Sequence, residues 1–166
     1  MKRLLLKRNV SMTMTPLREI FSSIRNQRLE EENKKVGDAL VKQFRLELRE
    51  AEVKILDDEG RTGNHYRLEQ GEAGVEVSLH GSKDGWWGVG VNYVNKVEEW
   101  GRHWGVVLLA PEERFWIDER DFFSIVTGNI STANTHELNL PPLKKSPLLV
   151  IPFSSVREFL SISGLR

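Results

Sequence analysis

The first fifty residues carry apolar side chains with a helical period. Thr15-Pro16 is a typical helix start, because threonine caps free amides and proline fits the first turn. Apolar residues then follow at i, i+3, i+4 and i+7, at Leu17, Ile20, Phe21 and Ile24. Residues 25–35 are almost wholly polar, and the stripe resumes over residues 36–48. The pattern predicts two helices, or one long helix whose polar middle forms a bridge or arm.

Beyond the turn-forming residues 57–64 the period changes to two, which is typical of strands. Three segments alternate in this way and predict an antiparallel meander: HYRLE (65–69), VEVSLH (75–80) and WWGVGVNYV (86–94). In VEVSLH the alternation places Glu76, Ser78 and His80 on one face and three apolar side chains on the other. We expect the polar row to lie on the solvated face of the sheet.

The remaining segments complete an α+β pattern. We expect a hairpin of residues 105–110 and 114–117, a short helix capped by Asp118, an irregular stretch over 128–147, a strand at PLLVIPF and a final helix with a capping box at Ser155 and Glu158. The predicted fold is an N-terminal helical region followed by a mixed or antiparallel sheet of five to six strands with short flanking helices. We expect a single domain over residues 1–166, with 1–35 as a basic helical arm or N-terminal helix and 36–166 as an α+β core.

Composition narrows the classes of function. The chain has no cysteine, which excludes a disulfide scaffold, a thiol nucleophile and a thiolate zinc site. Its apolar runs are too short to span a bilayer, and its start lacks the apolar core of a secretory signal. We therefore expect a cytoplasmic location and no membrane partner.

Charge is unevenly distributed along a chain of zero net charge. Residues 1–50 carry 12 lysines and arginines against 7 acids, whereas residues 51–126 carry 8 against 15. Four basic residues of the arm are predicted to contact nucleic-acid phosphates, namely Arg25, Arg28, Lys34 and Lys35. Two alternatives remain for this segment: a solvated helix face, and a homodimer contact through its apolar stripes.

Five tryptophans fall within 31 residues, and two of them are adjacent. Trp86 and Trp87 must face opposite sides of a strand, so only one of them belongs to a given side. The outward one, Trp86, is the predicted contact residue for a base or another flat ligand. Burial of the tryptophans in the core is the competing interpretation.

The polar row also suggests metal chemistry. A strand carboxylate, Glu76, with a second carboxylate from Glu69 or Asp58, would supply the oxygen ligands that Mg²⁺ prefers. Such an ion activates water and stabilises the leaving oxygen of a phosphodiester. The alternative is that Glu76 is simply a polar residue on the wet side of a strand.

A helix with acidic residues, a strand, a turn, a strand reading VEVS, a meander and a closing helix together resemble the PD-(D/E)XK restriction-endonuclease-like nucleases. The resemblance covers about residues 36–126 and implies a Mg²⁺-dependent endonuclease with Glu76 as the family glutamate. Ser78 stands where the family has its lysine, so Lys83 in the following turn would take the lysine's part. HYRLE also lacks the family's first aspartate. The alternative function is a non-catalytic nucleic-acid- or protein-binding module with a degenerate nuclease-like core.

Overall fold

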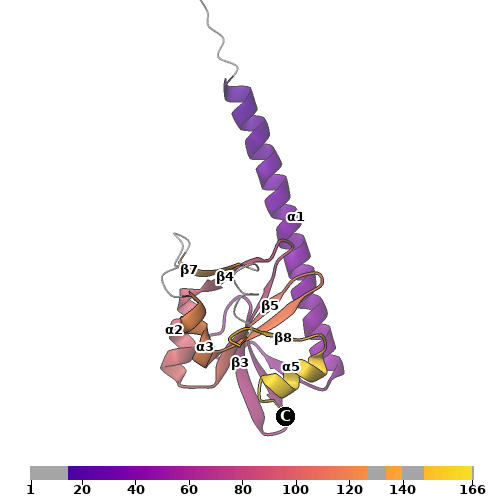
Figure 1. Ribbon diagram of the computed structural model, residues 1–166, viewed down its shortest axis with the longest axis vertical. Helices are drawn as coiled ribbons and strands as arrows, with labels where there is room; N and C mark the ends of the chain where they lie inside the picture. Colours follow the sequence, from indigo (N-terminus) through magenta and orange to yellow (C-terminus); the bar gives the residue numbers. More distant parts are fainter. Residues whose placement is uncertain (1–14, 127–133, 140–147, 166) are drawn as a thin grey trace, which may run out of the picture. The chain divides into compact units, whose positions relative to one another are not determined.

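The computed structural model describes residues 15–126, 134–139 and 148–165. The chain divides into two compact units, Met1–Glu32 and Asn33–Arg166. The fold is α+β, with a long N-terminal helix, a mixed six-stranded sheet and a two-stranded sheet (Figure 1). This confirms the predicted fold class. The candidate site lies in the second unit.

Helix α1 is one continuous helix, Thr15–Glu50, so the alternative of two helices is wrong. Within the second unit one face of α1 is apolar and buried, and it includes Val41, Phe44 and Leu48. Gly37 lies on the same stretch, and its backbone touches that of Gly81: a Cβ atom added at Gly37 would be 2.5 Å from the carbonyl oxygen of Gly81. The absence of two side chains thus lets α1 approach the sheet at this point.

The large sheet has the strand order β1-β2-β3-β5-β6-β8. Its strands are β1 (Lys54–Leu56), β2 (His65–Gln70), β3 (Ala73–Gly81), β5 (Trp104–Leu109), β6 (Arg114–Asp118) and β8 (Ile151–Pro152). Strands β3 and β5 are parallel, and all other neighbours are antiparallel. The pairs β2–β3 and β5–β6 are the two hairpins that the alternation predicts.

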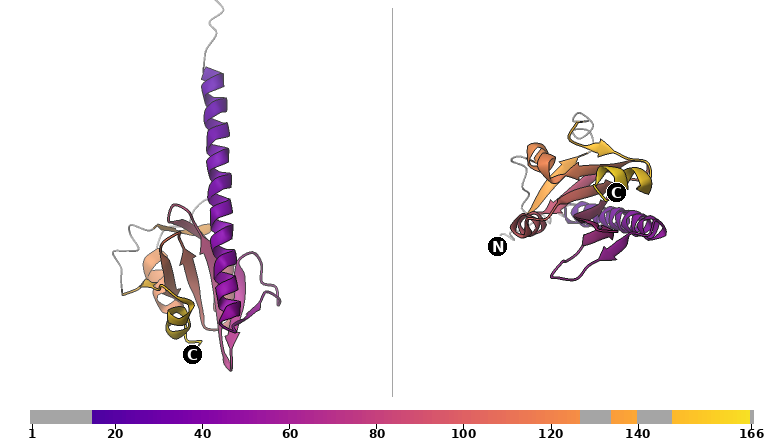
Figure 2. Two further views of the ribbon diagram at one scale, coloured as in Figure 1. Left: turned by 90° about the vertical axis from the view of Figure 1, so that its right-hand side faces the viewer. Right: turned by 90° about the horizontal axis from the view of Figure 1, so that it is seen from below.

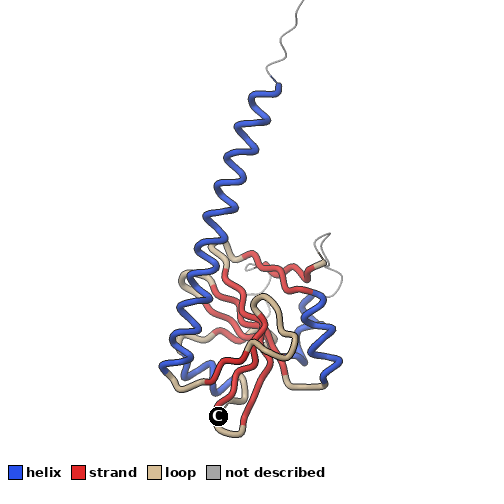
Figure 3. The backbone as a smooth tube through the Cα atoms, turned by 180° about the vertical axis from the view of Figure 1, so that it is seen from behind, coloured by secondary structure: helices blue, strands red, loops and turns tan. Residues whose placement is uncertain are grey.

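Both faces of the large sheet are covered. One face packs against α1 and α5 (Val156–Ile162), and its core includes Val77, Phe44 and Phe159. The opposite face packs against α2 (Val91–Trp100) and α3 (Glu119–Val126), as Figure 3 shows from behind and Figure 2 from the side and from below. Parallel strands such as β3 and β5 need a crossover, and α2 supplies it on this second face.

The prediction that residues 86–94 form the third strand of a meander is wrong in two respects. Only Trp86–Gly90 is a strand, β4, and residues 91–100 form α2 instead. The segment VNYVNKVEEW spaces Val94 and Val97 three apart, which fits a helix, and α2 ends at Gly101, a left-handed C-cap. β4 pairs with β7 (Thr135–Asn139) in a separate two-stranded sheet.

The strand β7 also corrects the expectation of an irregular stretch over 128–147. Residues 127–133 and 140–147 lie outside the described residues, so the rest of that expectation is not addressed. Helix α3 begins after Asp118, whose Oδ1 accepts the backbone N–H of Arg120, and Ser155 caps α5. None of the described helices is both long and apolar enough to cross a membrane.

Candidate functional site

The polar row of β3 is buried, contrary to its expected place on a solvated face. Glu76 is 0% exposed and Ser78 is 4% exposed, while His80 is partly buried. The reason is the position of β3 in the middle of a sheet that helices cover on both sides. A buried carboxylate must be compensated by charge and hydrogen bonds, so the surroundings of Glu76 define the candidate site.

Glu76 is held by Arg61 in a two-point ion pair. Nε of Arg61 donates to Oε2 of Glu76 at 2.8 Å, and its Nη2 donates to Oε1 at 2.6 Å. Arg61 lies in the loop before β2, and its side chain is also fully buried. Nε2 of His65, the first residue of β2, lies 2.8 Å from Oε2 of the same carboxylate. Glu76 therefore has bonds to both oxygens within the protein.

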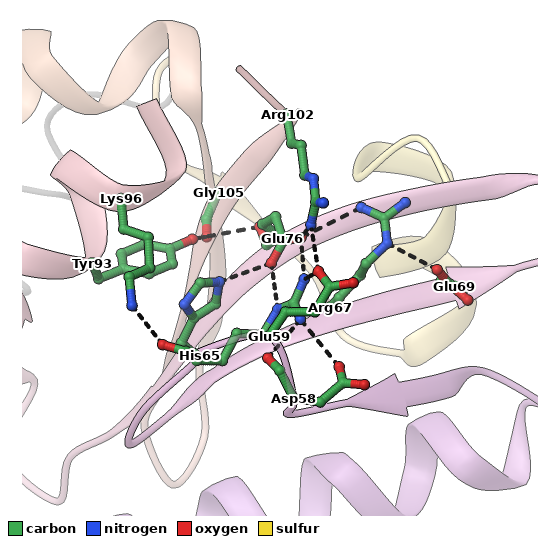
Figure 4. A network of polar contacts seen from close by, with 12 residues as sticks. Asp58, Glu59, His65, Arg67, Glu69, Glu76, Tyr93, Lys96, Arg102 and Gly105 are labelled. Carbon is green, nitrogen blue, oxygen red and sulfur yellow. Dashed lines mark hydrogen bonds and ion pairs between the residues drawn. The ribbon is translucent and has the colours of Figure 1, made fainter. Parts of the chain in front are cut away.

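Two further arginines surround the same carboxylate, as Figure 4 shows. Arg102, in the connection from α2 to β5, donates to Oε1 of Glu76 at 3.1 Å, and Arg67 donates to it from β2 at 3.4 Å. Arg102 also pairs with Glu59, which contacts Arg61 as well. One carboxylate thus joins the loop before β2, strand β2, strand β3 and the connection from α2 to β5.

The charges of this network reinforce one another. Burial alone would raise the pKa of Glu76, but hydrogen bonds from Arg61, His65 and Arg102 outweigh it and hold the pKa well below its usual range. The pKa of Arg61 is raised, chiefly by its hydrogen bond to Glu76. Glu76 is therefore ionised across the physiological range.

The other two predicted metal ligands lie at the rim of the network. Oδ1 of Asp58 is 3.3 Å from Nη1 of Arg61, and Oε1 of Glu69 accepts from Nε of Arg67 at 2.8 Å. Each of these carboxylates thus contacts an arginine that itself contacts Glu76. Among the described residues, no group of three or more His, Asp or Glu is arranged to hold a metal ion. The donor set fits arginine and does not fit Mg²⁺.

The remaining predicted site residues lie elsewhere. Lys83 is exposed in the turn after β3; the strand from Glu76 to Gly81 alone spans roughly 16 Å. Trp86 is 52% exposed on β4, whereas Trp87 is 2% exposed, which confirms that the two face opposite sides. The four basic arm residues, Arg25, Arg28, Lys34 and Lys35, are all exposed on α1.

A pocket of about 420 Å³ lies beside the network, between the loop before β2 and helix α2. His65 and Tyr93 take part in both features, since each lines the pocket and contacts Glu76 or its backbone. The hydroxyl of Tyr93 donates to the carbonyl oxygen of Gly105 at 2.8 Å. Burial, followed by the charges of Glu76 and Glu119, raises the pKa of Tyr93, so the phenol stays neutral.

No protein-family model, no curated protein and no solved structure matches this chain.

Sequence reasoning gave no role to Arg61, His65, Tyr93 or Arg102. One signal was available for their neighbour Arg67: the β2–β3 hairpin register sets Arg67 directly opposite Glu76. An opposite-charge pair across a hairpin is a known stabilising pattern. The sequence offers no comparable signal for Arg61, because a turn rich in glycine and acidic residues predicts only that its side chains are exposed.

Proposed function

We propose that the protein is a non-catalytic binding module that associates with a second copy of itself through the N-terminal part of α1. The single observation that carries this proposal is a stripe of large apolar side chains that are exposed to solvent. Its members and their exposed fractions are Leu17 (60%), Ile20 (52%), Phe21 (68%) and Ile24 (42%). We call these four residues the apolar stripe.

The spacing of the apolar stripe favours a helical partner. Positions i, i+3, i+4 and i+7 lie on one face of a helix, which is the pattern of anchors that pair with another helix or enter a groove. Burying a leucine, isoleucine or phenylalanine contributes about 1.5–3 kcal/mol each. In a two-fold symmetric dimer both copies bury the same four residues, so a short apolar stripe suffices for a measurable affinity.

The non-catalytic part of the proposal rests on Arg61. Its guanidinium lies against Glu76 where the nuclease resemblance would require a metal ion. A cleavage assay with Mg²⁺ or Mn²⁺ on mixed DNA and RNA substrates tests this directly. We expect no cutting; cutting that Glu76→Gln abolishes would restore the nuclease interpretation.

The experiment on association compares two matched variants of α1. Ile20→Glu places a charge within the apolar stripe, whereas Leu29→Glu places the same charge about two and a half turns further on, at the opposite side of the helix. Leu29 has a similar exposed fraction, 48%. We expect the wild type and Leu29→Glu to dimerise in sedimentation equilibrium, and Ile20→Glu to dimerise at least about tenfold more weakly.

The proposal of self-association fails if the wild type is a monomer throughout the micromolar range. It also fails if both variants weaken the dimer equally, since the effect would then reflect charge and not the apolar stripe. Circular dichroism of both variants checks that α1 remains helical.

Nucleic-acid contact is a second candidate, which the exposure of Arg25, Arg28, Lys34 and Lys35 favours. Glu30 to Glu32 lie between these residues and oppose phosphate binding. If the arm binds nucleic acid, affinity should fall steeply with salt, and Arg25→Gln/Arg28→Gln should reduce the log–log salt slope by about two. Arg120→Gln, which removes an exposed arginine elsewhere, is the control.

A further inference from the structure

The C-terminal half of α1 carries three cations that no carboxylate neutralises. Among the residues that the structure describes, no acidic side chain pairs with Lys42, Arg45 or Arg49. By contrast, five other arginines of the second unit each lie within 3.1 Å of a carboxylate oxygen. This face of α1 therefore has positive charge available for an anion from outside the chain.

The side chain of Arg45 is held in a fixed place. Its guanidinium carbon lies 4.7 Å from the centroid of the Tyr66 ring, which is a cation–π contact with β2. Its Nε is buried without a hydrogen-bond partner among the described residues, whereas Nη1 and Nη2 are not buried. A guanidinium that is enclosed at its stem and open at its end is positioned to donate two parallel hydrogen bonds to one oxyanion.

A depression of about 320 Å³ lies beside these side chains. It is lined by Lys42, Arg45, Leu46 and Arg49, and the described lining contains no carboxylate. Lysine and arginine are hydrogen-bond donors and not acceptors, so the lining suits a ligand group that has only acceptors, such as a phosphate diester. Leu46, which is 42% exposed, adds an apolar contact for carbon atoms next to such a group.

The helix dipole explains one of the three cations. A cation in the last turn of a helix is stabilised by the free carbonyl groups, and Arg49 lies in the last turn of α1. Lys42 and Arg45 precede that turn. Arg45 and Arg49 are also four positions apart, a spacing at which like charges destabilise a helix. An anion bound between them would remove this repulsion.

The cations form a line along α1. At about 3.6 residues per turn, an arc of about 100° contains six of the residues between positions 34 and 49. Five of the six are cations, namely Lys34, Lys35, Lys42, Arg45 and Arg49, and the sixth is Asp38. The line is roughly 22 Å long. A nucleic-acid strand carries one charge per about 3.4 Å of its helix axis, so several phosphates fit along this length.

We propose that this face of α1 binds the phosphate backbone of a nucleic acid without reading its sequence. Arg45 donates to one phosphate through both terminal nitrogens, while Lys42 and Arg49 neutralise neighbouring phosphates. The proposal rests neither on the self-association through α1 nor on Arg25 and Arg28, because all of its residues lie in the second unit.

The test measures binding of the full-length protein to fluorescein-labelled RNA and DNA, single- and double-stranded, by fluorescence anisotropy at several salt concentrations. We expect Lys42→Gln/Arg49→Gln to reduce the slope of log affinity against log salt by roughly 1.4–1.8, because two fewer cations displace counterions. Both side chains are exposed, so this variant should fold normally. The control is Arg157→Gln, which removes an exposed arginine of α5 and should leave the slope unchanged.

A conservative variant separates the charge of Arg45 from its geometry. Arg45→Lys keeps the positive charge but loses the two parallel donors. We therefore expect an unchanged salt slope and an affinity lower by about threefold to tenfold. An affinity equal to that of the wild type would overturn the two-point contact through Arg45.

The remaining outcomes distinguish this site from other sites and other ligands. The proposal is overturned if the wild type binds none of the oligonucleotides at low salt, or if Lys42→Gln/Arg49→Gln leaves the slope unchanged. If Arg25→Gln/Arg28→Gln alone reduces the slope, the phosphates bind to the N-terminal part of α1 instead. Tighter binding to vesicles of anionic phospholipid, or to a polyglutamate peptide, than to every oligonucleotide would also overturn it.

Discussion

Arg61 and Glu76 form a two-point ion pair in which neither side chain is exposed to solvent. They are fifteen positions apart in the chain, and strand β2 and the turn into β3 lie between them. Removing two charges from water is unfavourable, and the pair offsets this only through close geometry and additional hydrogen bonds. Arg102 and His65 supply those bonds.

The first prediction concerns this pair. Arg61→Met should lower the free energy of unfolding by about 3–5 kcal/mol, because it leaves a buried carboxylate without its main partner. Arg120→Met is the matched control: Arg120 also lies 2.8 Å from a carboxylate, that of Asp118, but its side chain is 80% exposed, so we expect less than about 1 kcal/mol. Urea unfolding measures both. Equal effects would show that burial of the pair has no energetic importance.

The second prediction concerns the approach of α1 to the sheet at Gly37. Alanine is normally better than glycine inside a helix by about 1 kcal/mol. Gly37→Ala should nevertheless destabilise, because the new Cβ atom would lie 2.5 Å from the carbonyl oxygen of Gly81. Gly90→Ala, where a Cβ atom would meet nothing within 4 Å, should cost no more than about 1 kcal/mol, because alanine is only a poorer N-cap than glycine for α2. A rise in melting temperature for Gly37→Ala would refute the close contact.

The third prediction uses the two adjacent tryptophans. Trp87 is buried among α2, α3 and β5, and its Nε1 donates to the carbonyl oxygen of Leu109 at 3.3 Å. Trp87→Ala should reduce stability by about 3–5 kcal/mol. Trp86→Ala should change it by about 0.5 kcal/mol or less, because most of this side chain is already in water. Chemical denaturation of the two variants distinguishes them, and similar losses would contradict the orientation of β4.

The fourth prediction concerns pH. Burial lowers the pKa of His80 to about 4, compared with about 6.5 in an unfolded chain. Between these values the unfolded chain binds a proton that the folded chain does not, so the free energy of unfolding falls as pH falls from 6.5 to 4. The loss reaches roughly 3 kcal/mol at the lower end. His80→Gln should flatten this dependence, and an unchanged slope would contradict the lowered pKa of His80.

Much of the fold was predictable because local rules agree with it. Thr15-Pro16 begins a helix, the hairpin β5–β6 follows alternation, and Ser155 caps α5 as its spacing with Glu158 predicts. The strand predicted over residues 86–94 was too long at its C-terminal end. Val91 and Tyr93 continue the alternation of β4, while Val94 and Val97 fit a helix equally well. Tertiary packing decided between two periods that coincide over a few residues.

The site was less predictable than the fold. Alternation correctly put Glu76, Ser78 and His80 on one face of β3, but a strand cannot reveal whether a helix covers that face. Ser78 illustrates the outcome: its hydroxyl lies 2.5 Å from Nε2 of His80 beneath the covering layer. The arginines around Glu76 come from segments far apart in the sequence, and no local pattern links them.

The network at Glu76 also has a kinetic consequence. Three connections that would otherwise open separately, the loop before β2, the β2–β3 hairpin and the α2–β5 connection, share one anion. Releasing any one of them exposes a buried charge, so they should open as one cooperative unit in native-state hydrogen exchange. The backbone N–H of Arg61, which donates to the carbonyl oxygen of Asp58 within this otherwise exposed loop, should then exchange together with the β2–β3 hairpin.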